Sequence, residues 1–208
     1  MSAATSHAEQ PATFAFAPDN LKRAEKIIAK YPAGRQQSAL LPLLDLAQRQ
    51  HGNWLPRAAM DYVAGLLDIA PIRAYEVATF YTMFNLNPVG TWFVQICTTT
   101  PCWLRGSDEI VKACEHKLGI GLNETTPDGK FTLKEVECLG ACVNAPMVQI
   151  NDDYYEDLTA ESMKAILTAL VEGREVPIGS QTGRRGSMPE GGPTSLQKLA
   201  KKRGVIDA

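Results

Sequence analysis

The sequence predicts an α+β protein: a helical bundle, then a small α/β domain, then an irregular tail. Three observations lead to this prediction. Residues 18–88 repeat apolar side chains at helical spacing, residues 89–175 mix alternating and helical patterns, and residues 176–208 form an extended basic tail rich in Gly, Pro and Ser. Hydrophobic residues make up 45% of the 208 residues, so the patterned parts of the chain can bury a core.

The first segment, residues 1–17, is rich in Ala, Ser, Thr and Pro, and we expect it to be mobile. It has neither the basic nor the apolar region of a secretory signal, which predicts a cytoplasmic chain. The net charge of −2 gives no reason to expect a nucleic-acid partner. No apolar run approaches the about 20 residues that cross a bilayer, so we expect no direct membrane insertion.

The helical region is predicted to hold four short helices joined by tight connectors, as in a small bundle. We expect Asp19 to cap the first helix. The second helix spans residues 38–51, where Pro42 is tolerable only near the first turn. The third and fourth helices open at Pro56 and Pro71, positions at which proline costs no hydrogen bond. The side chains expected to point inward on the fourth are Ala74, Val77, Ala78, Tyr81 and Phe84.

The α/β domain is predicted to follow the order strand, helix, strand, hairpin, helix. Residues 92–96 read as a buried strand, and residues 107–118 as a helix capped by Ser107. Residues 131–138 alternate apolar and polar side chains, which is typical of a half-buried strand. Two short apolar runs around residues 151–153 predict the hairpin, and a last helix follows it, capped by Thr159.

Four of the five cysteines form two close pairs, each directly after a predicted strand. Cys97 and Cys102 are separated by four residues, and Cys138 and Cys142 by three. Pairs on neighbouring loops can converge on one site, which is what a four-thiolate metal centre requires. The fifth cysteine, Cys114, falls on the apolar face of a helix and is predicted to be a core residue.

The spacing of the pairs favours a two-iron centre. A structural zinc site usually uses Cys-x2-Cys turns, in which two sulfurs grip one ion. The wider loops here suit a [2Fe–2S] core in which each pair binds its own iron. Zinc stays open on spacing alone. A disulfide framework is not expected without a secretory signal, and the chain has no Cys-x-x-Cys dithiol motif.

The segments around the cysteines resemble a known family. Cys97-Thr-Thr-Thr-Pro-Cys102, followed by Leu104-Arg-Gly-Ser107, is similar to the E subunit family of NADH–quinone oxidoreductase, the respiratory complex I. The run Glu137-Cys-Leu-Gly-Ala-Cys142, with Ala145-Pro146 after it, is similar too. Further similarity lies in residues 31–40 and 76–84, and the resemblance extends from about residue 18 to 175.

The resemblance implies a thioredoxin-like [2Fe–2S] ferredoxin domain behind the helical bundle, with Cys97, Cys102, Cys138 and Cys142 as the cluster ligands. It implies an electron-transfer subunit that exchanges single electrons with the FMN of a partner NADH-binding flavoprotein subunit. The large iron–sulfur subunit of complex I would be a second partner. FMN and NADH would lie on the flavoprotein subunit, so this chain by itself would have no catalytic residue and no complete active site. The expected location is the peripheral arm, on the cytoplasmic side of the bacterial inner membrane.

The same resemblance leaves one alternative parent complex. Subunits of this type also occur in soluble NAD-linked hydrogenases and formate dehydrogenases. The basic tail resembles extensions in complex I members, which favours the respiratory complex.

Overall fold

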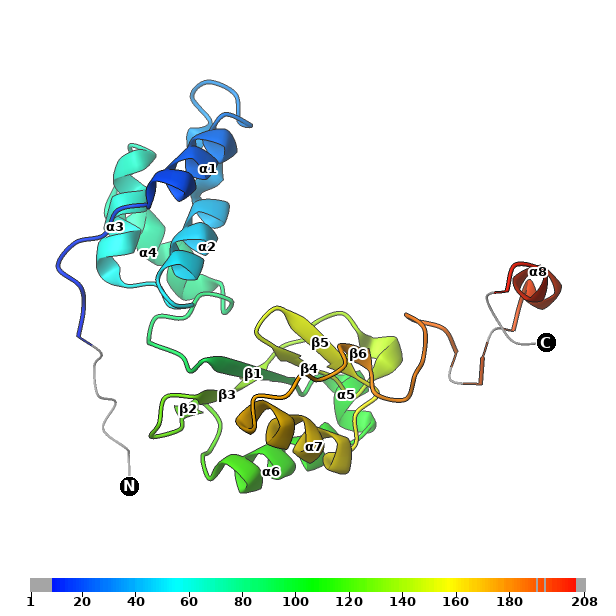
Figure 1. Ribbon diagram of the computed structural model, residues 1–208. Coiled ribbons are helices and arrows are strands. Elements are labelled where there is room, and N and C mark those ends of the chain that lie inside the picture. Colours follow the sequence, from blue (N-terminus) through cyan, green and yellow to red (C-terminus); the bar gives the residue numbers. More distant parts are fainter. Residues whose placement is uncertain (1–8, 190, 193, 205–208) are drawn as a thin grey trace. The chain divides into compact units, whose positions relative to one another are not determined.

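The computed structural model describes residues 9–189, 191–192 and 194–204 (Figure 1). The chain divides into two compact units, residues 1–89 and 90–208, each with its own hydrophobic core. Of the N-terminal segment that was expected to be mobile, residues 1–8 lie outside the described residues. Within the ranges described, none of the helices combines the length and the apolar character needed to span a membrane.

The first unit is helical, as predicted. Its core is formed mainly by leucines of the second helix and by small residues of the third and fourth, with Leu43, Leu44, Val63 and Ala74 fully buried. Its elements are α1 (Pro18–Ile28), the 3-10 turn η1 (Gln36–Ala39), α2 (Leu40–Gln50), α3 (Arg57–Leu66) and α4 (Pro71–Phe80).

Several details of this unit differ from the sequence prediction: α2 begins at Leu40 after a 3-10 turn, and α3 begins at Arg57 with Pro56 as its cap residue. Helix α1 begins at Pro18, so Asp19 lies inside the first turn, where its charge favours the helix dipole, and does not cap the helix. Helix α4 ends at Phe80 because the backbone becomes extended at Tyr81. Tyr81, expected to point inward, is therefore 41% exposed, whereas Phe84 is buried from the segment that follows the helix.

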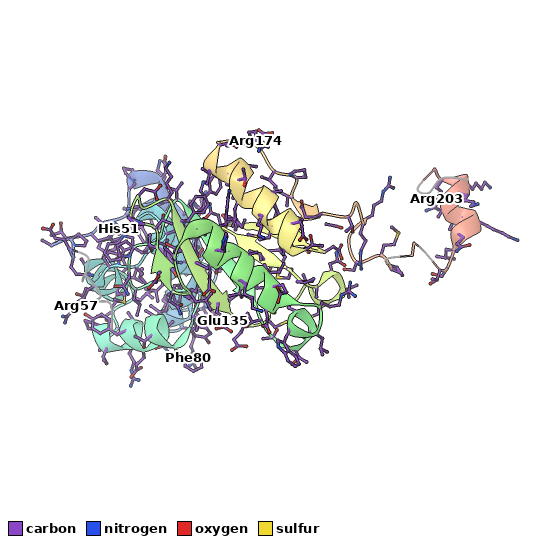
Figure 2. All side chains as sticks on the ribbon, turned by 90° about the horizontal axis from the view of Figure 1, so that it is seen from below. His51, Arg57, Phe80, Glu135, Arg174 and Arg203 are labelled. Carbon is purple, nitrogen blue, oxygen red and sulfur yellow. The ribbon has the colours of Figure 1, made fainter. Side chains whose placement is uncertain are left out.

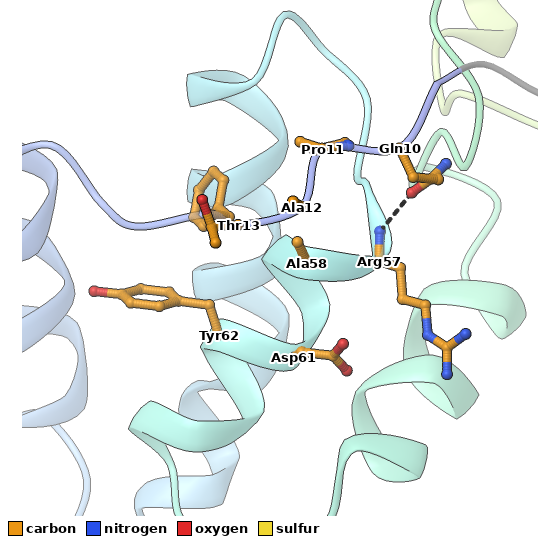
Figure 3. A pocket seen from close by; sticks show the side chains of 9 residues that line it. Gln10, Pro11, Ala12, Thr13, Arg57, Ala58, Asp61 and Tyr62 are labelled. Atoms are coloured by element: carbon orange, nitrogen blue, oxygen red, sulfur yellow. Dashed lines mark hydrogen bonds between the residues drawn. The ribbon is translucent and has the colours of Figure 1, made fainter.

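The N-terminal segment lies against α3. The backbone N–H of Arg57 donates a hydrogen bond to Gln10 Oε1 at 3.0 Å (Figure 3). The Phe14 ring makes edge-to-face contacts with Phe16 and Tyr62. A shallow pocket lies between residues 10–14 and α3. The segment of residues 10–16 is thus held against the helical core of the first unit.

The second unit contains a mixed sheet. In its described part, six strands are ordered β2-β3-β1-β4-β5-β6. Strand β1 pairs parallel with β3 and antiparallel with β4, and β4 and β5 form the predicted hairpin. The strands are β1 (Trp92–Cys97), β2 (Glu124–Thr125), β3 (Phe131–Val136), β4 (Val148–Ile150), β5 (Asp153–Glu156) and β6 (Gly179–Ser180).

Two helices, α6 (Ser107–Leu118) and α7 (Ala160–Val171), lie side by side over one face of this sheet (Figures 1 and 2). Val94 and Leu133 of the sheet pack against Ile110 and Cys114 of α6 and Leu167 of α7. Cys114 is fully buried in this core, in the position predicted for it.

The parallel pairing of β1 and β3 positions the two cysteine pairs. In the strand register, Cys97 lies opposite Val136, the last residue of β3. Parallel strands end at the same edge of a sheet, which is where ligand-binding loops of such sheets lie. The segment after β1, which carries Cys102, and the turn after β3, which carries Cys138, therefore leave the sheet side by side.

Several elements were not predicted: β2, β6, α5 (Thr100–Leu104), α8 (Gln197–Lys202) and the 3-10 turn η2 (Cys142–Asn144). Cys102, expected on a loop, lies in α5, which has Pro101 in its first turn, where the ring suits helical geometry. Ser107 was expected to cap α6 but is its first residue and is fully buried. Gly106, at φ 93°, takes the capping position because a left-handed residue links α5 and α6 in one tight turn.

Candidate metal centre

The two cysteine pairs differ in their exposure to solvent. Cys97, at the end of β1, and Cys102, in α5, are both 1% exposed. Cys138, in the turn after β3, is exposed, and Cys142, at the start of η2, is half-buried. The sulfurs of Cys138 and Cys142 are 3.4 Å apart. The Cys97–Cys102 pair is thus buried, whereas the Cys138–Cys142 pair lies at the surface.

The two pairs lie on segments that follow the neighbouring parallel strands β1 and β3. The Cys97 thiol contributes to the pKa shifts of Cys102, Cys138 and Cys142, so the four thiols influence one another. None of the four is in a disulfide. Among the described residues, no three His, Cys, Asp or Glu side chains converge on a point that could hold a single metal ion. The structure thus places the four predicted ligands as two pairs at the same edge of the sheet and leaves Cys114 in the core.

The surroundings shift the pKa values of three of these thiols in different directions. Burial, helped by the hydrogen bond with Cys97, raises the pKa of Cys102 to about 12. The hydrogen bond with Cys138 raises the pKa of Cys142, with burial as the second cause. The backbone N–H of Gly140 points at the Cys138 sulfur and lowers the pKa of that thiol. Gly140 adopts φ 86°, a left-handed conformation that glycine takes without strain.

Neighbouring side chains hold the two loops in place. Tyr154 donates its hydroxyl hydrogen to the carbonyl oxygen of Leu139 at 2.9 Å, inside the Cys138–Cys142 loop. Arg105 Nε donates to the carbonyl oxygen of Ala145 at 3.4 Å, which links the end of α5 to the segment after η2. The Thr99 hydroxyl lies 3.3 Å from the Cys97 sulfur. No sequence motif marks Tyr154, and the motif that contains Arg105 does not reveal its contact, because both partners are backbone oxygens brought close by the fold.

The donor set fits an iron–sulfur group. Thiolates are soft ligands that suit iron–sulfur clusters and zinc and are poor ligands for magnesium or calcium. Two thiol pairs, each on its own loop, match a two-iron core with two protein sulfurs on each iron. The Gly140 N–H directed at Cys138 is the type of donor that stabilises a ligating sulfur.

Residues 24–171 match the family model described as "Thioredoxin-like [2Fe-2S] ferredoxin". The chain belongs to this ferredoxin family. The family is named for a [2Fe–2S] cluster, and this is the cofactor that the sequence predicted. The predicted fold class is confirmed as well: a mixed α+β chain with helices first and a sheet-containing ferredoxin unit after them.

Two relatives of this ferredoxin chain define its subfamily. It is 66% identical over 157 residues, 76% of this chain and 94% of the relative, to the E subunit of the NADH-quinone oxidoreductase of Rickettsia conorii. It is 58% identical over 183 residues, 88% of this chain and 74% of the relative, to the mitochondrial NADH dehydrogenase (ubiquinone) flavoprotein 2 of Dictyostelium discoideum. These relatives confirm the resemblance inferred from the cysteine motifs, and with it the family of oxidoreductase subunits.

A solved structure shares the fold of this ferredoxin chain. The NAD+-reducing [NiFe]-hydrogenase in its H2-reduced state superposes with a TM-score of 0.56 at 18% identity. The match covers 65% of this chain and 23% of the hydrogenase chain. At this identity the likeness concerns the fold alone.

Proposed function

We propose that Cys97, Cys102, Cys138 and Cys142 hold one [2Fe–2S] cluster, and that the chain passes single electrons through it. The observation that carries the proposal is the placement of two thiol pairs on the segments after β1 and β3, which end at the same edge of the sheet. A bound cluster would supply one-electron redox chemistry, which no protein side chain in this site offers.

The chain's own residues would set the properties of this site. The Cys97 and Cys102 sulfurs are shielded from water, while Cys138 reaches the surface. The Gly140 N–H would stabilise negative charge on the Cys138 sulfur, and the Thr99 hydroxyl would do the same at Cys97. The Cys138 side of the site is therefore the natural side for electrons to enter and leave.

We further propose that the chain is the electron-transfer subunit of an NADH–quinone oxidoreductase. Its partners would be the flavoprotein subunit that binds FMN and NADH and the large iron–sulfur subunit, in the peripheral arm on the cytoplasmic side of the membrane. The high identity to a subunit of this enzyme from Rickettsia conorii supports this parent complex. The alternative is the equivalent subunit of a soluble NAD-linked hydrogenase or formate dehydrogenase, for which the hydrogenase match supplies a shared fold.

The surface beside the cysteines supports a protein partner. Trp103 and Leu104 follow Cys102 directly and are 57% and 71% exposed, and Val143 follows Cys142 and is 61% exposed. Large apolar side chains at this exposure, next to a redox site, are typical of a surface that another subunit covers.

The first test is the composition of the purified chain. We expect equal amounts of iron and acid-labile sulfide, about two of each per chain, and one paramagnetic resonance signal after dithionite reduction. Zinc in place of iron, with no such signal from freshly isolated protein, would contradict the cluster assignment.

The second test addresses the partner. The chain is co-expressed with an FMN- and NADH-binding subunit, and co-purification is compared between wild type and Leu104→Asp. We expect Leu104→Asp to reduce the recovered partner strongly, because a charge would be buried in the interface. Val171→Asp is the control: Val171 is 53% exposed at the end of α7 and not beside a ligand cysteine. Equal loss in both variants would argue against this surface as the docking face.

A further inference from the structure

The segment after β6 returns to the turn that carries Cys142. Its key residue is Arg184, whose side chain is 8% exposed and whose Nη2 lies 2.7 Å from Asp157 Oδ1. The Asp157 side chain is itself only 5% exposed, and its Oδ2 accepts a hydrogen bond from Ser180 at 2.6 Å. This ion pair is buried, unlike the exposed pairs found elsewhere on the described surface.

The same guanidinium group contacts the ligand turn directly. Arg184 Nη1 donates to the carbonyl oxygen of Val143 at 3.1 Å and to Asn144 Oδ1 at 3.3 Å. Val143 and Asn144 are the two residues that follow Cys142 in η2. The Arg184 side chain thus connects Asp157 to the turn that contains Cys142.

Asn144 extends this contact into a network. Its Nδ2 donates to Glu156 Oε2 at 2.7 Å and to the carbonyl oxygen of Gly186 at 2.8 Å. The backbone N–H of Asp157 donates to the Asn144 carbonyl oxygen at 2.7 Å. The η2 turn is therefore fastened both to the end of β5 and to the tail.

The chemistry of this contact requires arginine. A planar guanidinium can bind a carboxylate on one side and two carbonyl-type oxygens on another, whereas an ammonium group is a single point charge. Burying it is costly unless its partners are well placed. Arg184 Nε is in fact buried without a hydrogen-bond partner among the described residues. The contacts of its two terminal nitrogens nevertheless link the η2 turn to Asp157.

We propose that Arg184 is a positioning residue for the iron–sulfur site: it fixes the η2 turn and thereby the position of Cys142, which would hold the cluster. The inference rests on the proposed function, because Cys142 matters in this way only as a ligand. It assigns the start of the tail a role in holding the cluster. Without Arg184, the surface-exposed pair of ligands would release iron more readily than the buried pair.

The test compares Arg184→Lys with Arg174→Lys in the full-length chain. Arg174 lies just beyond the end of α7 (Figure 2) and forms an exposed ion pair with Glu172. Both substitutions keep the charge. Iron release to a chelator should be about tenfold faster in Arg184→Lys, the effect typical of losing an outer partner of a metal ligand, and unchanged in Arg174→Lys. The resonance signal and midpoint potential of the retained cluster should also shift in Arg184→Lys alone.

A second variant separates positioning from stability. Arg184→Met combined with Asp157→Asn removes both charges, so no lone charge stays buried. We expect this double variant to unfold near the wild-type temperature yet still to release iron quickly and to show the altered signal. Recovery of normal iron retention along with stability would overturn the positioning role.

The two proposals fail in different ways. Wild-type protein without a [2Fe–2S] signal would overturn the proposed function, and this inference with it. A normal wild-type cluster together with equal iron release and unchanged signals in Arg184→Lys and Arg174→Lys would overturn the positioning role alone.

Discussion

At the scale of single residues, the five cysteines have three different environments. Cys97 and Cys102 are buried beside Met147 at the edge of the core, Cys138 and Cys142 lie at the surface, and Cys114 is enclosed between α6 and the sheet. Substitution of a cysteine should therefore have a different effect in each environment. Substitution at the surface pair should affect metal binding, whereas substitution at Cys114 should affect packing.

Cys142→Ser should abolish stable cluster binding and weaken the local fold, because cluster binding and folding are coupled. The measurement is iron and sulfide content with resonance spectroscopy of the reduced protein. Cys138→Ser should behave in the same way. Cys114→Ala is the control and should keep the full iron content, since its side chain packs in the core. Normal cluster content in Cys142→Ser, or cluster loss in Cys114→Ala, would refute the ligand assignment.

Cys114 should resist alkylation in the folded chain. Burial raises the pKa of its thiol from 9.0 to about 12, and the thiolate is the reactive form. In the cluster-free protein at mildly alkaline pH, iodoacetamide should modify Cys138 readily and Cys114 only after unfolding, as mass spectrometry of the peptides will show. Between pH 9.0 and about 12, the Cys114 thiol loses its proton in the unfolded chain but keeps it in the folded chain. The contribution of Cys114 to stability therefore falls as pH rises through this range. Equal labelling of both thiols in native protein would show that the core is open at α6.

At the scale of elements, single hydrogen bonds and close backbone contacts help to decide where helices and strands begin. Helix α7 starts with a capping box: Thr159 Oγ1 accepts from the Ser162 N–H at 3.1 Å, and Ser162 Oγ accepts from the Thr159 N–H at 2.9 Å. Strand β1 is preceded by Gly90, whose N–H donates to Thr132 Oγ1 at 2.6 Å. Each of these contacts depends on one residue, Thr159 or Gly90, so each can be tested by one substitution.

Thr159→Ala should lower the free energy of unfolding by about 1 kcal/mol, the usual cost of losing a helix N-cap. The measurement is the midpoint of urea unfolding followed by circular dichroism. Thr168→Ala, inside the same helix, is the matched control: its hydroxyl bonds only to the Lys164 carbonyl oxygen, and alanine has the higher helix propensity. A midpoint in Thr159→Ala no lower than that of Thr168→Ala would contradict the role of the cap.

Gly90→Ala should destabilise the second unit by about 1–3 kcal/mol, as overpacking usually does. A Cβ at this position would lie 2.8 Å from backbone atoms of Lys130 and Phe131, which cannot move without disturbing the β1–β3 pairing. Gly121→Ala in the same unit is the control, because its Cβ would meet only the Glu124 side chain at 3.5 Å. Thermal unfolding of both variants gives the comparison, and equal stability would mean that the backbone yields at Gly90.

At the scale of the whole molecule, the start of the tail is part of the folded second unit. Its first part belongs to the second unit: β6 pairs with β5, Val176 packs against the core and Arg184 pairs with Asp157. The tail was expected to be extended and irregular. Its start instead completes the sheet and covers Asp157.

Removing the tail should therefore have a position-dependent effect. A chain that ends at residue 175 loses β6 and leaves Asp157 without Arg184, and breaking a buried pair costs about 3–5 kcal/mol. A chain that ends at residue 189 keeps both. Urea unfolding should place the first well below full-length protein and the second close to it. Similar stability of both truncated chains would show that β6 and Arg184 contribute little.

The sequence by itself determined the elements with strong local signals. Helical periodicity located α2, α3, α6 and α7, alternation and apolar runs located the central strands, and the paired cysteine spacing indicated a two-iron site. These features depend on residues close together in the chain, where side-chain period and turn chemistry act directly. The core position of Cys114, apart from the two cysteine pairs, follows from the same patterns.

Only the tertiary structure decided how distant residues meet. The two-residue strands β2 and β6 have no periodicity to detect and exist because β3 and β5 offer them paired edges. The burial of Cys102 in α5 and the hydrogen bond from Arg184 to the Cys142 turn likewise depend on segments far apart in sequence. The physical reason is the same in each case: hydrogen bonds and burial between such segments form only once the sheet brings their backbones together.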